Sequence, residues 1–241
     1  MKNARILLLL PVLLALVLTA FRLRPADERK REVRALPAFA AVELAGAARV
    51  VLTQGSPQRV EVEGTAEELA RCESEVKDGR LRLASRPQAG NRSYSDKTDT
   101  RLTVYVTVPV LNALMLSGSG DIIAEGPLKT EALALAISGS GNLRLTQLMA
   151  SSLSTAVSGS GNVVLAGTSP AHVLTLSGSG NVRAKDLRTE TTDVTVSGSG
   201  NVAVTATVSA HASVRGSGNV NVAGGAKLTS EVKGSGRVKA E

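Results

Sequence analysis

The sequence predicts an all-β fold, a parallel β-helix (solenoid) whose coils are about 18–21 residues long. Three observations predict it. A GSG motif recurs seven times, and the first glycines of the copies are separated by 21, 20, 19, 20, 18 and 18 residues, a drifting period that suits a solenoid and excludes a heptad. Apolar and polar residues alternate between the motifs, as they do in strands. Each unit is also shorter than the roughly 30 residues that a strand, a crossover helix and a second strand require.

The alternation continues through the motifs and places their glycines on the core side. In one unit Leu174, Leu176, Gly178, Gly180 and Val182 share one side, and the residues between them share the other. Two successive core positions without a side chain allow the backbone to bend sharply at a narrow corner between two short strands. The glycines predicted to form these corners are Gly118, Gly120, Gly139, Gly141, Gly159, Gly161, Gly178, Gly180, Gly198, Gly200, Gly216, Gly218, Gly234 and Gly236.

The outward positions around these glycines carry Ser, Ser and Asn. Stacked coils lie about 4.8 Å apart, a spacing at which amide side chains can hydrogen-bond from coil to coil. We expect one such ladder, which begins at Asp121, ends at Arg237 and has as its rungs Asn142, Asn162, Asn181, Asn201 and Asn219. The seven motifs would form a flat stripe of hydroxyl and amide groups about 29 Å long. Such a stripe can contact a glycan or a protein, or it can serve only to stabilise the stack.

Residues 36–110 are predicted to form N-terminal β coils that continue into the GSG repeats of residues 111–241. Alternating apolar runs separated by Gly, Pro and Asp-Gly turns predict their strands. The crossover between parallel strands is right-handed by default. Residues 86–100 are polar and without periodicity, so we expect a long loop there. Its Tyr94 is a candidate contact residue, because long loops on a rigid scaffold often carry recognition.

One short helix is predicted near residues 65–76. Thr65 and Glu68 have the spacing of a capping box, and Leu69 and Cys72 recur on one helical face. Cys72 is the single cysteine, so the chain can form no internal disulfide. We expect this cysteine to be a small buried apolar residue. The alternative, a reactive thiol, requires a neighbouring histidine that this stretch lacks.

The N-terminal residues have the three parts of an export signal, namely a basic start, an apolar run and small residues. Residues 1–20 are therefore predicted to be a signal peptide, followed by a charged linker over residues 21–35. Arg22 and Arg24 directly after the apolar run leave a retained membrane anchor as the alternative.

The net charge of +7 does not indicate nucleic-acid binding. Residues 1–34 hold eight Lys or Arg and three Asp or Glu, which leaves +2 for the rest of the chain. The chain has two Phe, two Tyr and no Trp, so it largely lacks aromatic faces on which bases or sugar rings could stack. We expect no nucleic-acid partner, and contact with a membrane only through the N-terminal segment.

The GSG motifs do not match a phosphate, calcium or catalytic site. A phosphate-binding loop needs a helix after its glycines, whereas a Val-rich strand follows here. Only Asp121 offers a carboxylate at the step used by calcium-binding repeats. A serine nucleophile requires an activating base, and we expect His172 and His211 at the surface in different coils. No cofactor, metal ligand or catalytic residue is predicted.

Three acidic residues leave an enzyme open as an alternative, because β-helices that cleave polysaccharides cluster acids in one groove. Asp186, Glu190 and Asp193 fall in one segment between strands, beside Lys185 and Arg188, a composition typical of a solvated corner. Neither a paired carboxylate in an adjacent unit nor a stacking aromatic accompanies them. The sequence therefore favours a protein that is not an enzyme.

Four stretches carry a family resemblance over about residues 39–238: FAAVELAGAARVVLTQGSPQRVEVEG, VKDGRLRL, LTVYVTVPVLNALMLSGSGDI and the recurring SGSGNV. With them the chain resembles the putative auto-transporter adhesin head GIN domain family of bacterial exported proteins. The resemblance implies a parallel β-helix and an adhesin-like role, and it brings no catalytic residues.

These observations predict an exported β-helical protein of the periplasm or cell surface of a bacterium, with an adhesin-like or structural role. The expected partner is a glycan or an envelope protein. The alternatives are a carbohydrate-active enzyme on a β-helix and a signalling or assembly partner in the envelope.

Overall fold

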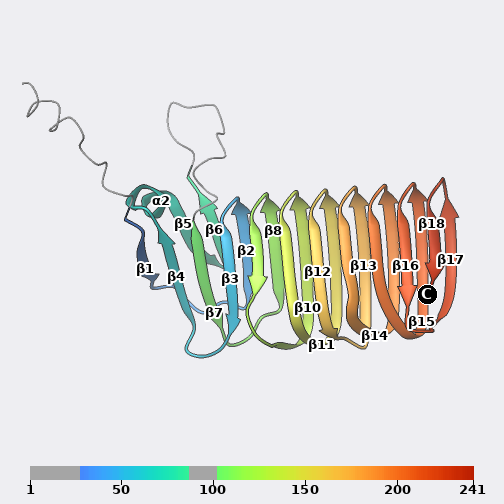
Figure 1. Ribbon diagram of the computed structural model, residues 1–241. Coiled ribbons are helices and arrows are strands. Elements are labelled where there is room, and N and C mark those ends of the chain that lie inside the picture. Colours follow the sequence, from blue (N-terminus) through green and yellow to red (C-terminus); the bar gives the residue numbers. More distant parts are fainter. Residues whose placement is uncertain (1–27, 87–101) are drawn as a thin grey trace, which may run out of the picture.

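The protein is a β-solenoid, as predicted. A computed structural model of the chain describes residues 28–86 and 102–241, and in this part every element except helix α2 (Ala66–Arg71) is a strand. The coils stack into an elongated body with the C-terminal coil at one end (Figure 1). The strands are β1 (Lys30–Arg34), β2 (Ala41–Gly46), β3 (Arg49–Gln54), β4 (Arg59–Gly64), β5 (Cys72–Lys77), β6 (Arg80–Ser85), β7 (Thr103–Val108), β8 (Ala113–Gly118), β9 (Asp121–Ala124), β10 (Leu128–Gly139), β11 (Asn142–Gly159), β12 (Asn162–Thr168), β13 (Ala171–Gly178), β14 (Asn181–Gly198), β15 (Asn201–Gly216), β16 (Asn219–Ala223), β17 (Lys227–Lys233) and β18 (Arg237–Ala240).

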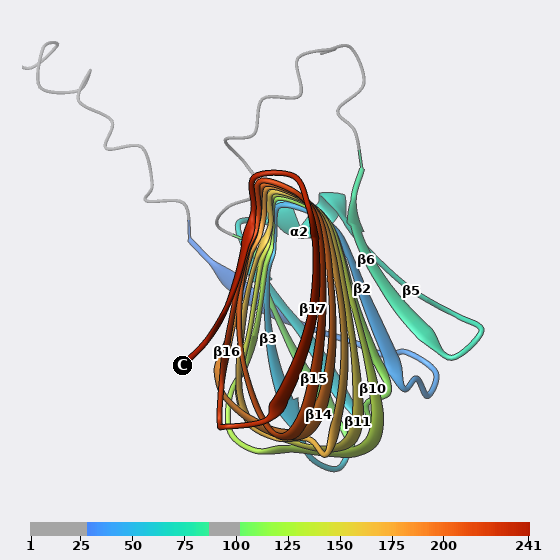
Figure 2. The ribbon, with the colours of Figure 1, turned by 90° about the vertical axis from the view of Figure 1, so that its right-hand side faces the viewer.

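Each repeat coil has two walls that meet at a narrow edge and are joined by a broad base (Figure 2). One wall ends in the first serine and glycine of each motif, for example at Ser117 in β8 and Ser138 in β10, and we call it the serine wall. The chain bends at the motif and returns along the asparagine wall, which begins with Asp121 in β9 and Asn142 in β11. Neighbouring coils pair in parallel with equivalent motif residues opposite one another.

The drift in repeat length is absorbed away from the narrow edge. The ladder pairing shifts register between Leu145 and Leu148 in β11, and between Ala184 and Arg188 in β14. Such irregularities insert or remove residues locally without disturbing the ladder on either side. The GSG motifs therefore stay in register even though the spacing between them varies from 18 to 21 residues.

The narrow edge forms because the motif glycines bring successive coils into close contact. The first glycine of each motif has a φ between +115° and +131°, a conformation that side chains disfavour. A Cβ on Gly139 would lie 2.5 Å from the carbonyl oxygen of Gly118, and one on Gly141 would lie 2.5 Å from that of Gly120. The N–H groups of Ser140 and Gly141 both donate to the Gly118 carbonyl, at 2.9 and 3.0 Å. The bend thus needs a glycine at the first position for its conformation and at both positions for space.

The interior is a stack of aliphatic side chains in columns that run along the solenoid. One column is buried throughout and contains Leu116, Ile137, Val157, Leu176 and Val196. Burying each such side chain contributes roughly 1.5–3 kcal/mol relative to leaving it exposed. Apolar residues occupy the inward-facing alternate positions in every coil. Successive coils therefore cover one another's apolar side chains, and the stack forms one continuous core.

The surface position expected for His172 is wrong. In β13 this residue is 1% exposed, and its Nε2 lies 3.1 Å from Oγ1 of Thr155. Burial lowers the pKa of His172 to about 4. His172 has the same parity as Leu174 and Leu176, so the alternation that located the glycines already places it inward. His211, the other histidine, is exposed.

Antiparallel strands cover the N-terminal end of the stack, where β4 pairs with β7, β1 with β4, and β5 with β6. Helix α2 lies beside them and is shorter than the predicted residues 65–76. The capping box forms, with Oε2 of Glu68 2.8 Å from the backbone nitrogen of Thr65. The helix nevertheless ends at Arg71, because Cys72 opens β5 and pairs with Ser85 of β6. Cys72 is buried, in agreement with the sequence.

Candidate binding surface

A ladder of side-chain hydrogen bonds runs along the asparagine wall. Nδ2 of each asparagine donates to Oδ1 of the equivalent residue one coil earlier. The bonds run from Asn142 to Asp121 at 2.9 Å, Asn162 to Asn142 at 3.0 Å, Asn181 to Asn162 at 3.1 Å, Asn201 to Asn181 at 3.1 Å and Asn219 to Asn201 at 2.9 Å. The structure thus brings all five expected rungs and Asp121 into one column, which we call the asparagine ladder.

Asp121 fixes the direction of the asparagine ladder. An ionised carboxylate only accepts hydrogen bonds, so Asn142 donates from its Nδ2 to Asp121 and points its Oδ1 to the next coil. Each following asparagine therefore adopts the same amide orientation. A guanidinium nitrogen of Arg49 lies 3.5 Å from the other carboxylate oxygen. At the far end Asn219 stands in register with Arg237. Hydrogen bonds aligned in this way polarise one another in the same sense.

Each interior rung keeps hydrogen-bonding capacity for a ligand. A carboxamide has two N–H donors and an oxygen with two lone pairs, and the asparagine ladder uses one donor and one lone pair per rung. One donor and one acceptor per rung stay available, repeated about every 4.8 Å along the wall. This combination matches a hydroxyl group, which both donates and accepts.

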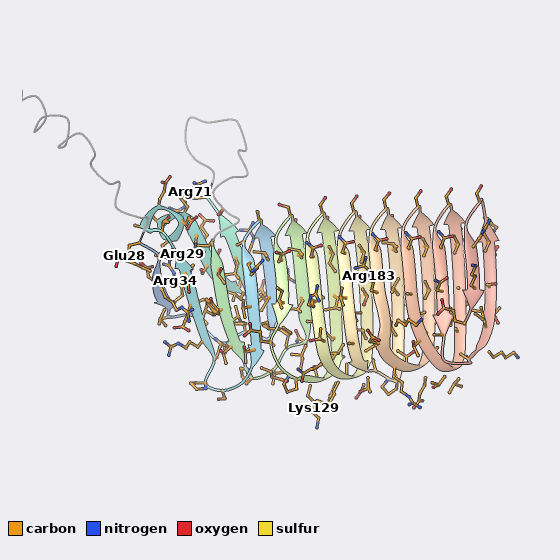
Figure 3. All side chains as sticks on the ribbon, viewed as in Figure 1. Glu28, Arg29, Arg34, Arg71, Lys129 and Arg183 are labelled. Atoms are coloured by element: carbon orange, nitrogen blue, oxygen red, sulfur yellow. The ribbon has the colours of Figure 1, made fainter. Side chains whose placement is uncertain are left out.

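The motif serines do not share one flat face with the ladder, contrary to the stripe expected from the sequence. The first serines form a column on the serine wall, where Ser138 opposes Ser117 and Ser158. The second serines, such as Ser140, stand at the bend between the walls, and Asn142 begins the opposite wall. Side chains line this narrow edge along the whole stack (Figure 3). Because the glycine conformation turns the chain back on itself, the Ser, Ser and Asn positions wrap over the edge.

A groove of about 500 Å³, which we call the basic groove, lies on the asparagine wall toward the C-terminal end. Three cations line it, Arg183, Arg237 and Lys239, together with Asn221 and the ladder rungs Asn181, Asn201 and Asn219. Figure 3 shows Arg183 on the outside of this wall. Sequence reasoning missed the groove. The available signal was register, since Arg183, Asn221 and Lys239 each stand two residues after a ladder position and share one outward column.

The cations of the basic groove are not neutralised by direct ion pairs in the described part of the chain. Arg183, Arg237 and Lys239 form no ion pair there, and no carboxylate of that part lines the groove. Glu241 follows closely in sequence, but its carboxylate accepts a hydrogen bond from Lys185 at 2.8 Å. This bond raises the pKa of Lys185 and is the main cause that lowers the pKa of Glu241, with a smaller contribution from the nearby Lys239 ammonium.

The acids considered for catalysis are not assembled into a pair. Asp186, Glu190 and Asp193 are all exposed on β14. Asp186 opposes Ala166 of β12 and Asp193 opposes Val173 of β13, so they belong to opposite sides of the coil. Within residues 28–86 and 102–241, no group of three or more His, Cys, Asp or Glu side chains could hold a metal ion.

Some predictions concern residues outside those that the structure describes. They are the export signal of residues 1–20, residues 21–27 of the linker predicted over residues 21–35, and the loop of residues 86–100 with Tyr94, apart from its first residue. Within the described ranges, no helix has the length and apolar character needed to cross a membrane.

The fold and surface define a class of protein, a β-solenoid whose outer wall carries a hydrogen-bonded ladder of amide side chains. More particularly, the chain belongs to the family described as "Putative auto-transporter adhesin, head GIN domain", whose model matches residues 38–226. This match confirms the resemblance inferred from the GSG repeats and the N-terminal stretches. Comparison with curated proteins finds no match.

Solved structures share the fold over nearly the whole chain. A putative adhesin from Bacteroides fragilis is 25% identical, with a TM-score of 0.83, and the match covers 90% of this chain and 99% of that one. A putative lipid binding protein from Parabacteroides distasonis is 19% identical, with a TM-score of 0.72 and coverage of 89% and 97%. A putative adhesin from the same species is 21% identical, with a TM-score of 0.71 and coverage of 89% and 98%.

Proposed function

We propose that the protein is an exported, non-enzymatic, adhesin-like component of the bacterial envelope that binds a glycan or an envelope protein through the outer surface of its solenoid. The observation that carries this proposal is the asparagine ladder, which repeats unused donor and acceptor groups along one wall. Membership of an adhesin-head family and similarity to proteins named putative adhesins support the adhesin-like role.

The ladder is suited to binding because it is already ordered. Each interior rung is held by its two neighbours and stands on a strand of the stacked sheet, so a ligand need not immobilise these side chains. Binding then avoids an ordering cost of about 0.5–1.5 kcal/mol for each side chain that would otherwise be fixed. Weak contacts repeated along a rigid wall can add up to useful affinity for a polymer with its own repeat.

The proposal is tested by screening the purified protein against a glycan array and against solubilised envelope proteins. We expect binding that falls when Asn181 and Asn201 are both replaced by alanine, while Lys129→Ala at the base of the stack leaves it unchanged. Intact-mass measurement of the exported product would determine where the mature chain begins. Absence of any glycan or envelope partner, or binding indifferent to the ladder substitutions, would contradict the proposal.

The enzyme alternative is tested separately with a polysaccharide panel. We expect no cleavage, because Asp186, Glu190 and Asp193 are exposed and lie on different sides of the coil. Cleavage that disappears when one of these residues is changed to alanine would show that the protein is an enzyme. The signalling or assembly alternative would instead appear as one stoichiometric envelope protein whose binding does not change when Asn181 and Asn201 are replaced by alanine.

A further inference from the structure

We infer that the basic groove binds an acidic polysaccharide, with sugar carboxylates on Arg183, Arg237 and Lys239 and sugar hydroxyls on the asparagine ladder. The inference rests on the proposed function and names the ligand class and the place where it binds.

The charge of the groove favours an anionic ligand. Arg183, Arg237 and Lys239 line one groove of about 500 Å³ and form no ion pair in the described part of the chain. Like charges gathered on one wall repel, and an anion bound between them relieves this repulsion. A guanidinium group can hold a carboxylate with two parallel hydrogen bonds, which gives orientation as well as attraction.

The spacing of the cations favours a polymer over a small anion. Arg183 and Lys239 stand at the two ends of one outward column, with Ala203 and Asn221 between them. Three inter-strand steps separate these ends, a distance of about 14 Å at the usual strand spacing. A chain with carboxylates at intervals can contact both cations without either side chain bending toward the other. The small side chain of Ala203 leaves the middle of the column low enough for the chain to pass.

The amide groups favour a sugar over other anionic polymers. Asn181, Asn201 and Asn219 line the groove beside the cations, and the two interior rungs, Asn181 and Asn201, each keep one donor and one acceptor free of the ladder. Hydroxyl groups satisfy both, whereas phosphate and sulfate oxygens only accept. A single-stranded nucleic acid would stack its bases on aromatic side chains, and no aromatic residue of the described part lines the groove. An acyl chain would need a cleft lined by apolar side chains, whereas seven of the ten described residues that line this groove are asparagines or cations.

The test measures binding of the full-length protein to three probes. They are an oligogalacturonate, a neutral galacto-oligosaccharide of the same length, and phosphatidylglycerol vesicles. We expect binding of the oligogalacturonate alone, weakened by added salt. Arg183→Gln and Lys239→Gln should each weaken it about tenfold or more, since each removes a hydrogen bond to a charged group. Lys129→Gln is the matched control, because it removes one positive charge at the base of the stack (Figure 3) and should leave affinity unchanged.

The inference would be overturned by equal affinity of the groove variants and wild type, by an equal loss in Lys129→Gln, by binding of the vesicles only, or by no binding of the oligogalacturonate. Thermal unfolding of each variant verifies that the exposed substitutions leave the fold intact. Binding of the neutral sugar without dependence on Arg183 would overturn this inference while leaving the adhesin-like function standing. The two proposals can therefore fail independently.

Discussion

His172 is expected to make the protein less stable in mild acid. The imidazole is enclosed in the core between Leu153 and Thr192 of the neighbouring coils, and burial lowers its pKa to about 4. In the unfolded chain an ordinary histidine has a pKa of about 6.5. Between these values the unfolded state takes up a proton and the folded state does not. The contribution of His172 to the free energy of unfolding is therefore complete above pH 6.5 and is lost as the pH falls toward 4.

The size of the effect follows from the two pKa values. One pKa unit corresponds to about 1.36 kcal/mol. The free energy of unfolding should therefore drop by about 2 kcal/mol between pH 7 and pH 5, and by about 3 kcal/mol by pH 4, from this residue alone. Carboxylates also titrate in the lower part of this range, so the contribution of His172 is measured as a difference between variants at each pH.

The assay is denaturant unfolding of wild type, His172→Leu and His211→Gln from pH 7 to pH 4. Leucine suits the site because Leu153 occupies the equivalent position one coil earlier. His172→Leu leaves the Thr155 hydroxyl without its partner, and this loss lowers the free energy of unfolding equally at every pH. The substitution also removes the part of the pH dependence of that free energy that is due to His172. His211→Gln removes the exposed histidine and should keep the wild-type slope. Identical slopes for wild type and His172→Leu between pH 7 and pH 5 would refute the reasoning.

Three further predictions concern the edge, the ladder and the helix. Gly139→Ala should destabilise the fold by about 3 kcal/mol or more in thermal unfolding, because its Cβ would meet a backbone oxygen at 2.5 Å. The control is Gly126→Ala, which is also at positive φ but has open space around it. It should cost only about 1–2 kcal/mol in the same assay. Asn162→Ala removes two hydrogen bonds of the asparagine ladder and should lower the free energy of unfolding by about 1–2 kcal/mol. Ser160→Ala, at an exposed position two residues earlier, should be within about 0.5 kcal/mol of wild type. Equal stability of the two variants would show that the ladder does not stabilise the stack. Thr65→Ala breaks the capping box and should cost about 1 kcal/mol in chemical denaturation, an expectation that an unchanged midpoint would contradict.

The GSG repeats made the solenoid predictable because strand parity is a local property. Side chains alternate between two sides of any extended chain, so the apolar residues around Gly178 and Gly180 identify the core side without knowledge of the partner strand. The same parity places His172 inward, where the structure finds it buried. Helix α2 shows the opposite case, since Cys72 fits the helical pattern and the competing pairing with Ser85 lies 13 residues further along the chain.

The coil, its glycine bends and the rungs of the ladder follow from the amino-acid sequence alone, since each depends on alternation and on a repeated spacing. Which outward residues share a face depends instead on how the coils pack in three dimensions. That outcome depends on the angle at which positive-φ glycines such as Gly139 fold the walls together, and on the register that sets Arg183 and Lys239 in one column. Both are relations between coils, fixed by packing and hydrogen bonding across the stack.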